Sequence, residues 1–169
     1  MTTNTNAPSS PITDSAVLCL DADLNDPHHI NSVMQLLAEF IRDVISADSE
    51  LPAYTRENLV PLLRQHPAAR TYLAQLNGDY VGLAICQITL SSFQARPAMN
   101  IHDLHVSPAV RGRGIGTALI EYVADQARKE GCCQLTLEVE QANTRAKSLY
   151  HRTGFTSGRT LHEFWHRPL

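Results

Sequence analysis

The spacing of hydrophobic positions along the chain predicts helices at several places. Apolar residues recur every three or four positions up to residue 44 in a segment that opens with a capping aspartate and a first-turn proline at 26–27. The same spacing recurs at 114–130 and at 143–153. A weaker pattern at 55–63 contains Pro61, which either kinks a short helix or marks its first turn. These segments predict about four helices.

Short apolar runs between turn-forming residues predict strands, which we place at 16–20, 71–76, 80–90, 100–106, 134–139 and 159–165. Asn77-Gly78 separates the second and third of these runs and favours a tight type I′ turn, so the two strands should form a hairpin. An antiparallel meander followed by alternating strands and helices predicts an α/β fold. We expect a single mixed, mostly antiparallel sheet of six to seven strands, flanked by about four helices.

Length and composition favour one domain. The chain has 169 residues, of which 43% are hydrophobic, and this is enough for a substantial core. Residues 1–14 are polar and rich in Asn, Thr, Ser and Pro, so we expect a flexible N-terminal tail before a domain at 15–169. The tail lacks the apolar segment of a signal peptide, and no run approaches the roughly 18 apolar residues that cross a bilayer.

Charge and cysteine usage limit the partners and the cellular compartment that we expect. A net charge of -3 gives no general attraction to nucleic acid or to an anionic membrane, and we expect neither as a partner. The four cysteines form no CxxC pattern and are interpreted as small buried hydrophobes in a reducing, cytoplasmic setting. The eight histidines show no metal-ligand pattern, so we expect no metal. The sequence does not define an oligomeric state. A homodimer is possible, since dimers are the commonest assemblies of soluble proteins.

The most informative motif is Arg-Gly-Arg-Gly-Ile-Gly at 111–116, between an apolar strand and a helix. Glycines let a backbone approach a ligand closely, and the unpaired amides of a helix N-terminus bind anions. Arg111 and Arg113 add charge-assisted hydrogen bonds to phosphate oxygens. The spacing does not fit a dinucleotide fingerprint, and the chain has no Gly-Lys pair for a P-loop. A diphosphate of another kind is therefore expected, and a solvated charged turn is the simpler alternative.

A second motif follows one helix and one strand later: Asn143-x-x-Ala146-x-x-Leu149-Tyr150-x-x-x-Gly154-Phe155. Its inner residues share one helical face, and its first Asn and its Gly can cap and end a helix. Together with Arg111-x-x-Gly114-x-Gly116, in this order, the motif resembles the coenzyme A-binding signature of the general-control-type N-acetyltransferase (GNAT) superfamily. The resemblance is tightest over 100–155 and implies that 15–169 form an N-acetyltransferase domain.

The resemblance implies acetyl-CoA as co-substrate, and a sheet whose strands at 100–106 and 134–139 splay apart to admit the pantetheine arm. The cofactor-binding residues that it implies are Leu104, His105, Val106, Arg111, Gly112, Arg113, Gly114, Ile115, Gly116, Thr117 and Asn143. Main-chain groups of Leu104 and Val106 would hold the acetyl carbonyl and the pantetheine amides. The loop backbone would hold the diphosphate. Asn143 can cap its helix, bind the pantetheine arm, or do both.

An acceptor amine needs a base, because an alkylamine with a pKa near 10 is almost fully protonated at neutral pH. Regular alternation places Asn100, His102, Leu104 and Val106 on one strand face and Ile101, Asp103 and His105 on the other. A bulge would swap the faces. We expect His102 to be the base and hold Asp103 in reserve, because imidazole titrates near neutral pH. A hydrogen-bonded structural histidine is the competing interpretation.

Tyr150 is the candidate acid. Coenzyme A leaves as a thiolate whose parent thiol has a pKa of about 8.5, and a tyrosine with a pKa of about 10 can protonate it. Family members use the matching tyrosine in this way. A tyrosine on the inner face of a helix is otherwise a plain core residue, and only the flanking motif favours catalysis here.

We therefore predict an enzyme that transfers acetyl from acetyl-CoA directly to a primary amine, on a small molecule or a protein, in a ternary complex. The alternative is a catalytically idle acyl-CoA-binding or interaction module, and a nucleic-acid binder is the least favoured. The resemblance places the acceptor pocket around Glu39, Asp43, Tyr54, Phe164 and Trp165. The two carboxylates there either attract a cationic amine or form an ordinary solvated helix face. The sequence does not identify the amine.

Overall fold

The computed structural model describes residues 16–158 and 167, and within them one sheet has the strand order β1-β2-β3-β4-β5. The strands are β1 (Leu18–Asp21), β2 (Ala69–Leu76), β3 (Asp79–Ser91), β4 (Arg96–Val106) and β5 (Leu135–Leu137). Neighbours pair antiparallel except for β4 and β5, which are parallel. The expected mixed α/β sheet is confirmed. The described part holds five strands instead of six to seven, and the strand expected at 159–165 lies outside it.

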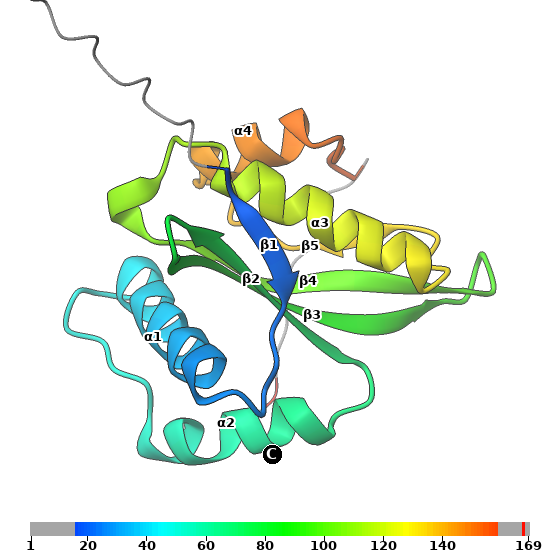
Figure 1. The fold of residues 1–169 in the computed structure, drawn as a ribbon. Coiled ribbons are helices and arrows are strands. Elements are labelled where there is room, and N and C mark those ends of the chain that lie inside the picture. Colours follow the sequence, from blue (N-terminus) through cyan, green and yellow to red (C-terminus); the bar gives the residue numbers. More distant parts are fainter. Residues whose placement is uncertain (1–15, 159–166, 168–169) are drawn as a thin grey trace, which may run out of the picture.

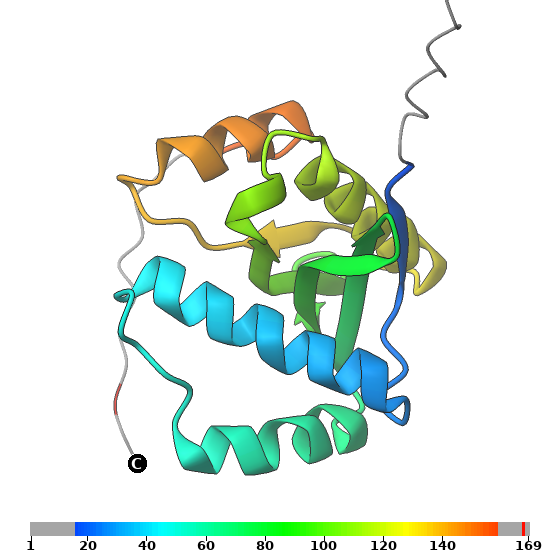
Figure 2. The ribbon, with the colours of Figure 1, turned by 60° about the vertical axis from the view of Figure 1, so that its left-hand side comes forward.

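Two pairs of helices cover the two faces of this sheet (Figures 1 and 2). The helices are α1 (Pro27–Val44), α2 (Ala53–Gln65), α3 (Ile115–Lys129) and α4 (Thr144–Arg152), with a short 3-10 turn η1 (Pro108–Val110) before α3. α1 and α2 lie on one face, and α3 and α4 lie on the other. None of the helices in the described part of the chain is long and apolar enough to span a membrane.

Alternating side chains of the central strands feed two separate hydrophobic cores. On β2, Leu73 packs under α1, whereas its neighbours Tyr72 and Ala74 pack under α3. On β3, Leu83 and Ile85 point to the first core, and Ala84 between them points to the second. This period of two is the reason why both helix layers can bury an apolar stripe against one sheet.

Local turn and cap chemistry fixes the ends of several elements as predicted. Asn77 and Gly78 join β2 to β3 with φ values of 54° and 94°, the positive values of a type I′ turn. Asp26 caps α1 by accepting a hydrogen bond of 2.8 Å from the amide of His28. Both predictions are confirmed.

Other predicted bounds are wrong by a few residues. The first strand spans 18–21 instead of 16–20, and β5 has three residues where six were expected. β4 begins at Arg96, so that the segment before 100 is strand and not loop. Pro61 lies inside α2, which starts at Ala53. Apolar spacing alone places strand ends poorly, because pairing with a neighbour decides where a strand stops.

All four cysteines are free thiols. The expectation that all are buried is wrong: Cys86 is buried in the core, whereas Cys19, Cys132 and Cys133 are half-buried. Burial raises the pKa of the Cys86 thiol to about 12, which makes it an inert core residue.

Candidate active site

β4 and β5 pair over a short stretch and then part. Met99, Asn100 and Ile101 of β4 face Leu135, Thr136 and Leu137 of β5. β4 continues to Val106 and stays paired with β3, but no strand of the described residues pairs with its other edge beyond Ile101. The predicted splay of these two strands is therefore present. It leaves half of β4 with an open edge inside the sheet.

The hydrogen-bond ladder shows which main-chain groups face this open edge. The amide of Ser107 donates to the carbonyl of Val81 on β3 at 2.9 Å. Because bonded pairs alternate in an antiparallel ladder, His105 opposite Leu83 also bonds β3, and Leu104 and Val106 point the other way. The carbonyl of Val106 accepts a hydrogen bond of 2.8 Å from the Arg111 side chain, so this carbonyl does point away from β3.

Of the three predicted strand contacts to the cofactor, Leu104 and Val106 thus reach the open edge and His105 does not. The main chain of His105 is bound to β3, and its ring lies under α1, with its centroid 5.7 Å from that of Phe40. The prediction that His105 binds cofactor does not fit this arrangement. That prediction came from the family resemblance, which does not show how main-chain bonds alternate along the strand.

A β-bulge at His102 overturns the regular alternation expected for β4. Ile101 pairs with Cys86 and Asp103 pairs with Ile85, so that His102 has no partner on β3. As a result, Ile101, Leu104 and Val106 all pack against the α3 core, although regular alternation had separated Ile101 from the other two. The faces swap at the bulge, which was the alternative left open.

The bulge brings both candidate bases to the start of the open edge. His102 is exposed and Asp103 is half-buried. Burial raises the pKa of the Asp103 carboxyl above its ordinary value, and the charge of the neighbouring His102 partly opposes this rise. Past the bulge, Asp103 and His105 share the face toward α1. The two candidates therefore lie side by side in very different surroundings.

The open edge leads into a loop whose amides are free. Gly112 and Gly114 have φ values of 84° and 79°, which other residues rarely adopt. Gly114 starts α3, and no side chain caps this N-terminus. Within the described residues, no amide from Gly112 to Thr117 donates to another backbone group, because the first turn of a helix has no partners. Such a row of amides can bind an anion.

The two arginines of the loop have different surroundings. The Arg111 guanidinium donates to both carboxylate oxygens of Asp43 on α1 and, through Nε, to the carbonyl of Val106. Its side chain is thus held in an internal ion pair, and the expected contact with phosphate stays a prediction. Arg113 is exposed, and no hydrogen bond or ion pair of its side chain is found among the described residues. Of the two, Arg113 is the one available to a ligand.

α4 carries the predicted acid. Asn143 caps this helix, because its Oδ1 accepts a hydrogen bond of 3.0 Å from the amide of Ala146. Gly154, at φ 85°, ends it, and the Phe155 amide returns to the Tyr150 carbonyl at 2.9 Å. Tyr150 is half-buried against Phe155, with ring centroids 5.8 Å apart, and burial raises the pKa of its hydroxyl. The cap role of Asn143 is confirmed, and a ligand role stays a prediction.

Gly116 allows α4 to lie against the start of α3. A Cβ at this position would stand 3.0 Å from Leu149 and 3.8 Å from Val106. The third glycine of the motif therefore serves close packing and not a special backbone angle. This contact brings the helix of Tyr150 next to the helix whose amides are free.

The predicted acceptor residues are only partly in reach of a ligand. Glu39 on α1 accepts a hydrogen bond of 2.6 Å from the Ser107 hydroxyl. The same carboxylate oxygen, Oε2, lies 3.5 Å from His105 Nε2. Burial alone would raise the Glu39 pKa, but hydrogen bonds from Ser107 and Gln35, together with the nearby His105 ring, outweigh it and lower the pKa. Tyr54 is 77% exposed. The sequence did not suggest the contact with Ser107, and Phe164 and Trp165 lie outside the described residues.

His105 itself is a buried polar side chain with one ring nitrogen that makes no hydrogen bond. Its side chain is 1% exposed, and Nε2 has no hydrogen-bond partner among the described residues. Burial is the main reason why its pKa is lowered, so the ring is neutral at neutral pH. Its closed position under α1 keeps it away from a substrate amine.

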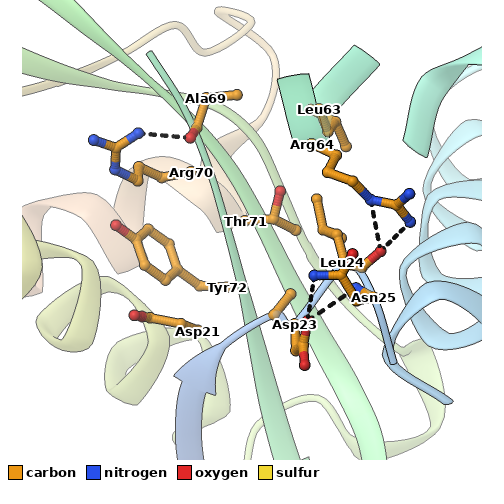
Figure 3. A pocket seen from close by; sticks show the side chains of 11 residues that line it. Asp21, Asp23, Leu24, Asn25, Leu63, Arg64, Ala69, Arg70, Thr71 and Tyr72 are labelled. Carbon is orange, nitrogen blue, oxygen red and sulfur yellow. Dashed lines mark hydrogen bonds between the residues drawn. The ribbon is translucent and has the colours of Figure 1, made fainter. Parts of the chain in front are cut away.

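The hollows among the described residues include a large groove and a smaller pocket. A groove of about 1500 Å³ runs along β5 and the end of α4 and is lined by Tyr150. A smaller pocket of about 290 Å³ lies between β1, β2 and the end of α2 (Figure 3). Its charged side chains are used locally: Arg64 donates to the Leu24 carbonyl, and Asp21 accepts from Tyr122. The smaller pocket is therefore a poor candidate for the site, which we place at the open edge of β4.

This arrangement can bind an extended ligand with an anionic end, because free strand groups run directly into free helix amides. Residues 31–155 match the model of the acetyltransferase (GNAT) family, and the chain belongs to this family. Among the described residues, no group of three or more metal-ligand side chains is found. The expectation of no metal stays a prediction.

Individual relatives agree on the family and differ in substrate. Streptothricin acetyltransferase of Streptomyces lavendulae is 39% identical over 88 residues, which cover 52% of this chain and 44% of that protein. Thialysine N-epsilon-acetyltransferase of Bos taurus is 37% identical over 86 residues, or 51% and 49% of the two chains. The chain thus spans about half the length of these relatives.

A solved structure shows the same fold over nearly the whole chain. It is an aminoglycoside acetyltransferase from an uncultured soil metagenomic sample, with a TM-score of 0.76 and 20% identity. The match covers 90% of this chain and 96% of that chain. At this identity the likeness shows the fold alone.

Proposed function

We propose that this protein is an N-acetyltransferase that moves the acetyl group of acetyl-CoA directly to a primary amine in a ternary complex. The observation that carries the proposal is the open edge of β4 from His102 to Val106, which leads into the free amides at the start of α3. Family membership supports the same reaction, and the named relatives acetylate different molecules. The acceptor is therefore proposed only as an amine.

Acetyl-CoA binding would use main-chain groups at both ends of this path. Leu104 and Val106 offer an amide or carbonyl to the pantetheine arm, and the amides from Gly112 to Thr117 offer donors to the diphosphate. Arg113 adds a charged side chain beside them. A main-chain amide directed at the thioester oxygen stabilises the negative charge that develops there when an amine attacks.

Removal of a proton from the amine falls to His102 or Asp103. At neutral pH roughly one alkylamine in a thousand is unprotonated, so the base must act before or during attack. His102 is exposed at the bulge, where it can meet an amine directly or through water. Asp103 has a raised pKa, which makes it a better proton acceptor than an ordinary aspartate.

Tyr150 is proposed to protonate the departing thiolate. Its raised pKa keeps the hydroxyl protonated throughout the neutral range, as a general acid requires. In the transfer a carbon–nitrogen bond forms and the carbon–sulfur bond of the thioester breaks. Starting from its protonated form, the amine loses two protons in all: one is released to solvent through the base, and the other is balanced by the proton that Tyr150 gives to the thiolate.

The test is to incubate the purified protein with acetyl-CoA and a panel of amines, and to measure free thiol. We expect release with at least one amine, and Tyr150→Phe should lower kcat at least tenfold without changing the Kd of coenzyme A. The matched control is Tyr122→Phe, which also removes one phenol hydroxyl, but one that donates to Asp21 on β1 and does not lie at the open edge of β4. Coenzyme A binding without turnover for every amine would support the idle binding module instead.

A further inference from the structure

The Arg111 side chain joins three parts of the protein. Nε donates to the carbonyl of Val106 at 2.8 Å, at the end of β4. Nη1 donates to Asp43 Oδ1 at 3.3 Å, and Nη2 donates to Asp43 Oδ2, on α1. The Arg111 side chain is 20% exposed and that of Asp43 is 38% exposed. The backbone of Arg111 leads directly into the residues with free amides, Gly112 to Thr117, which we call the amide-lined loop. One guanidinium therefore ties this loop to both β4 and α1.

The loop itself has little else to hold its shape. Gly112 and Gly114 are flexible residues in positive φ, and a Cβ at either would meet nothing within 4 Å. No side chain caps the start of α3. The amides from Gly112 to Thr117 make no backbone bonds in the described residues. A row of free amides binds an anion well only when it is preorganised, because ordering the loop on binding costs affinity.

We propose that Asp43 and Arg111 form a positioning pair that holds the amide-lined loop in its anion-binding shape, with Arg111 acting through the backbone and not as a phosphate ligand. This inference rests on the proposed binding of coenzyme A. It assigns a role to Asp43 on α1, more than 60 positions before the loop in the sequence. The ionised state of Asp43 is secure at neutral pH, because its hydrogen bond with Arg111 is the main cause that lowers its pKa.

The alternative is that Arg111 turns away from Asp43 and binds phosphate directly. Asp43 would then compete with the ligand for the guanidinium. Loss of Asp43 would free the arginine and leave coenzyme A affinity unchanged or improve it. The two interpretations therefore predict opposite signs for a single substitution.

The experiment measures the Kd of coenzyme A by calorimetry for the full chain and for Asp43→Ala, Arg111→Ala and the double variant. We expect each single variant to raise the Kd about tenfold, which corresponds to about 1.4 kcal/mol. The double variant should be no weaker than Arg111→Ala, because both substitutions break one unit. The KM for acetyl-CoA should rise with them while kcat at saturation stays the same.

Two further variants separate positioning from other effects. Arg111→Lys keeps the charge but not the fork that bonds Val106 and Asp43 together, so it should bind almost as weakly as Arg111→Ala. Glu130→Ala is the matched control, because Glu130 receives two hydrogen bonds from Arg70 with a similar exposure of 31%, away from the loop. It should leave the Kd unchanged.

Unchanged or tighter binding by Asp43→Ala, or full affinity in Arg111→Lys, would overturn the positioning role. An effect of Glu130→Ala as large as that of Asp43→Ala would also overturn it, because general loosening would then explain both. Thermal unfolding of each variant identifies those that fail to fold, in which case Asp43→Asn replaces Asp43→Ala. If the unchanged protein binds no coenzyme A, the proposed function fails together with this inference. If it binds and only the variants disagree, this inference fails alone.

Discussion

The two halves of β4 differ in how their edges are used. In the half from Arg96 to Ile101, the residues from Met99 onward pair with β5 as well as with β3, and Met99 and Ile101 are buried in the α3 core. From His102 to Val106 it has β3 on one side and no strand of the described part on the other. The first half completes the sheet, and the second half leaves donors and acceptors that a ligand can use.

The bulge at His102 marks the border between these halves. It changes which side chains face α1 and which face α3, and it puts two titratable residues at the point where pairing with β5 ends. We infer that the paired half carries stability and that the open half carries function. Substitutions on either side of the border test this division.

The largest expected effect lies in the paired half. Met99 is fully buried, and Met99→Ala should lower the free energy of unfolding by about 2–5 kcal/mol through lost contacts and a cavity. Urea denaturation measures this change. A loss below about 1 kcal/mol would show that the paired half is not a main source of stability.

The next effect lies at the border and concerns rate. His102→Gln should lower kcat about 100-fold at pH 7, while stability stays within about 0.5 kcal/mol because the side chain is exposed. Free-thiol assays and urea denaturation measure the two quantities. His28→Gln, another exposed histidine, is the control and should change neither. Full activity of His102→Gln together with an inactive Asp103→Asn would move the base to Asp103.

The smallest effect concerns the cost of a charge in the open half. The pKa of Asp103 is raised in the folded state, so its ionisation costs stability as pH rises from about 4 through the folded pKa. Asp103→Asn removes this cost and should stabilise the protein at pH 7 by about 1.4 kcal/mol for each unit of pKa difference, and not at pH 4. The surface variant Asp79→Asn should be indifferent at both pH values. Urea denaturation at the two pH values measures this, and equal effects at both would contradict it.

Features with local causes could be predicted from the sequence. Asn77-Gly78 makes its turn because both residues tolerate positive φ, and Asn143 caps α4 with its own side chain. The same holds for Gly154, which ends that helix. In each case the residues that decide the structure are neighbours in the chain.

Features that depend on distant partners could not be decided from the sequence. The ion pair of Arg111 with Asp43 joins residues 68 positions apart, and no local sequence pattern predicts it. The bulge at His102 depends on its register with β3, and the main-chain direction of His105 follows from the same ladder.

The brevity of β5 has a consequence for the dynamics of the chain. Only three residue pairs hold this strand to β4, so local opening here breaks few hydrogen bonds and should require less free energy than opening between β3 and β4. A pantetheine chain lying along Leu104 and Val106 would extend the sheet where β5 stops. The bound ligand would then slow amide hydrogen exchange where β4 and β5 meet, and it would serve as an additional strand of the sheet while it is bound.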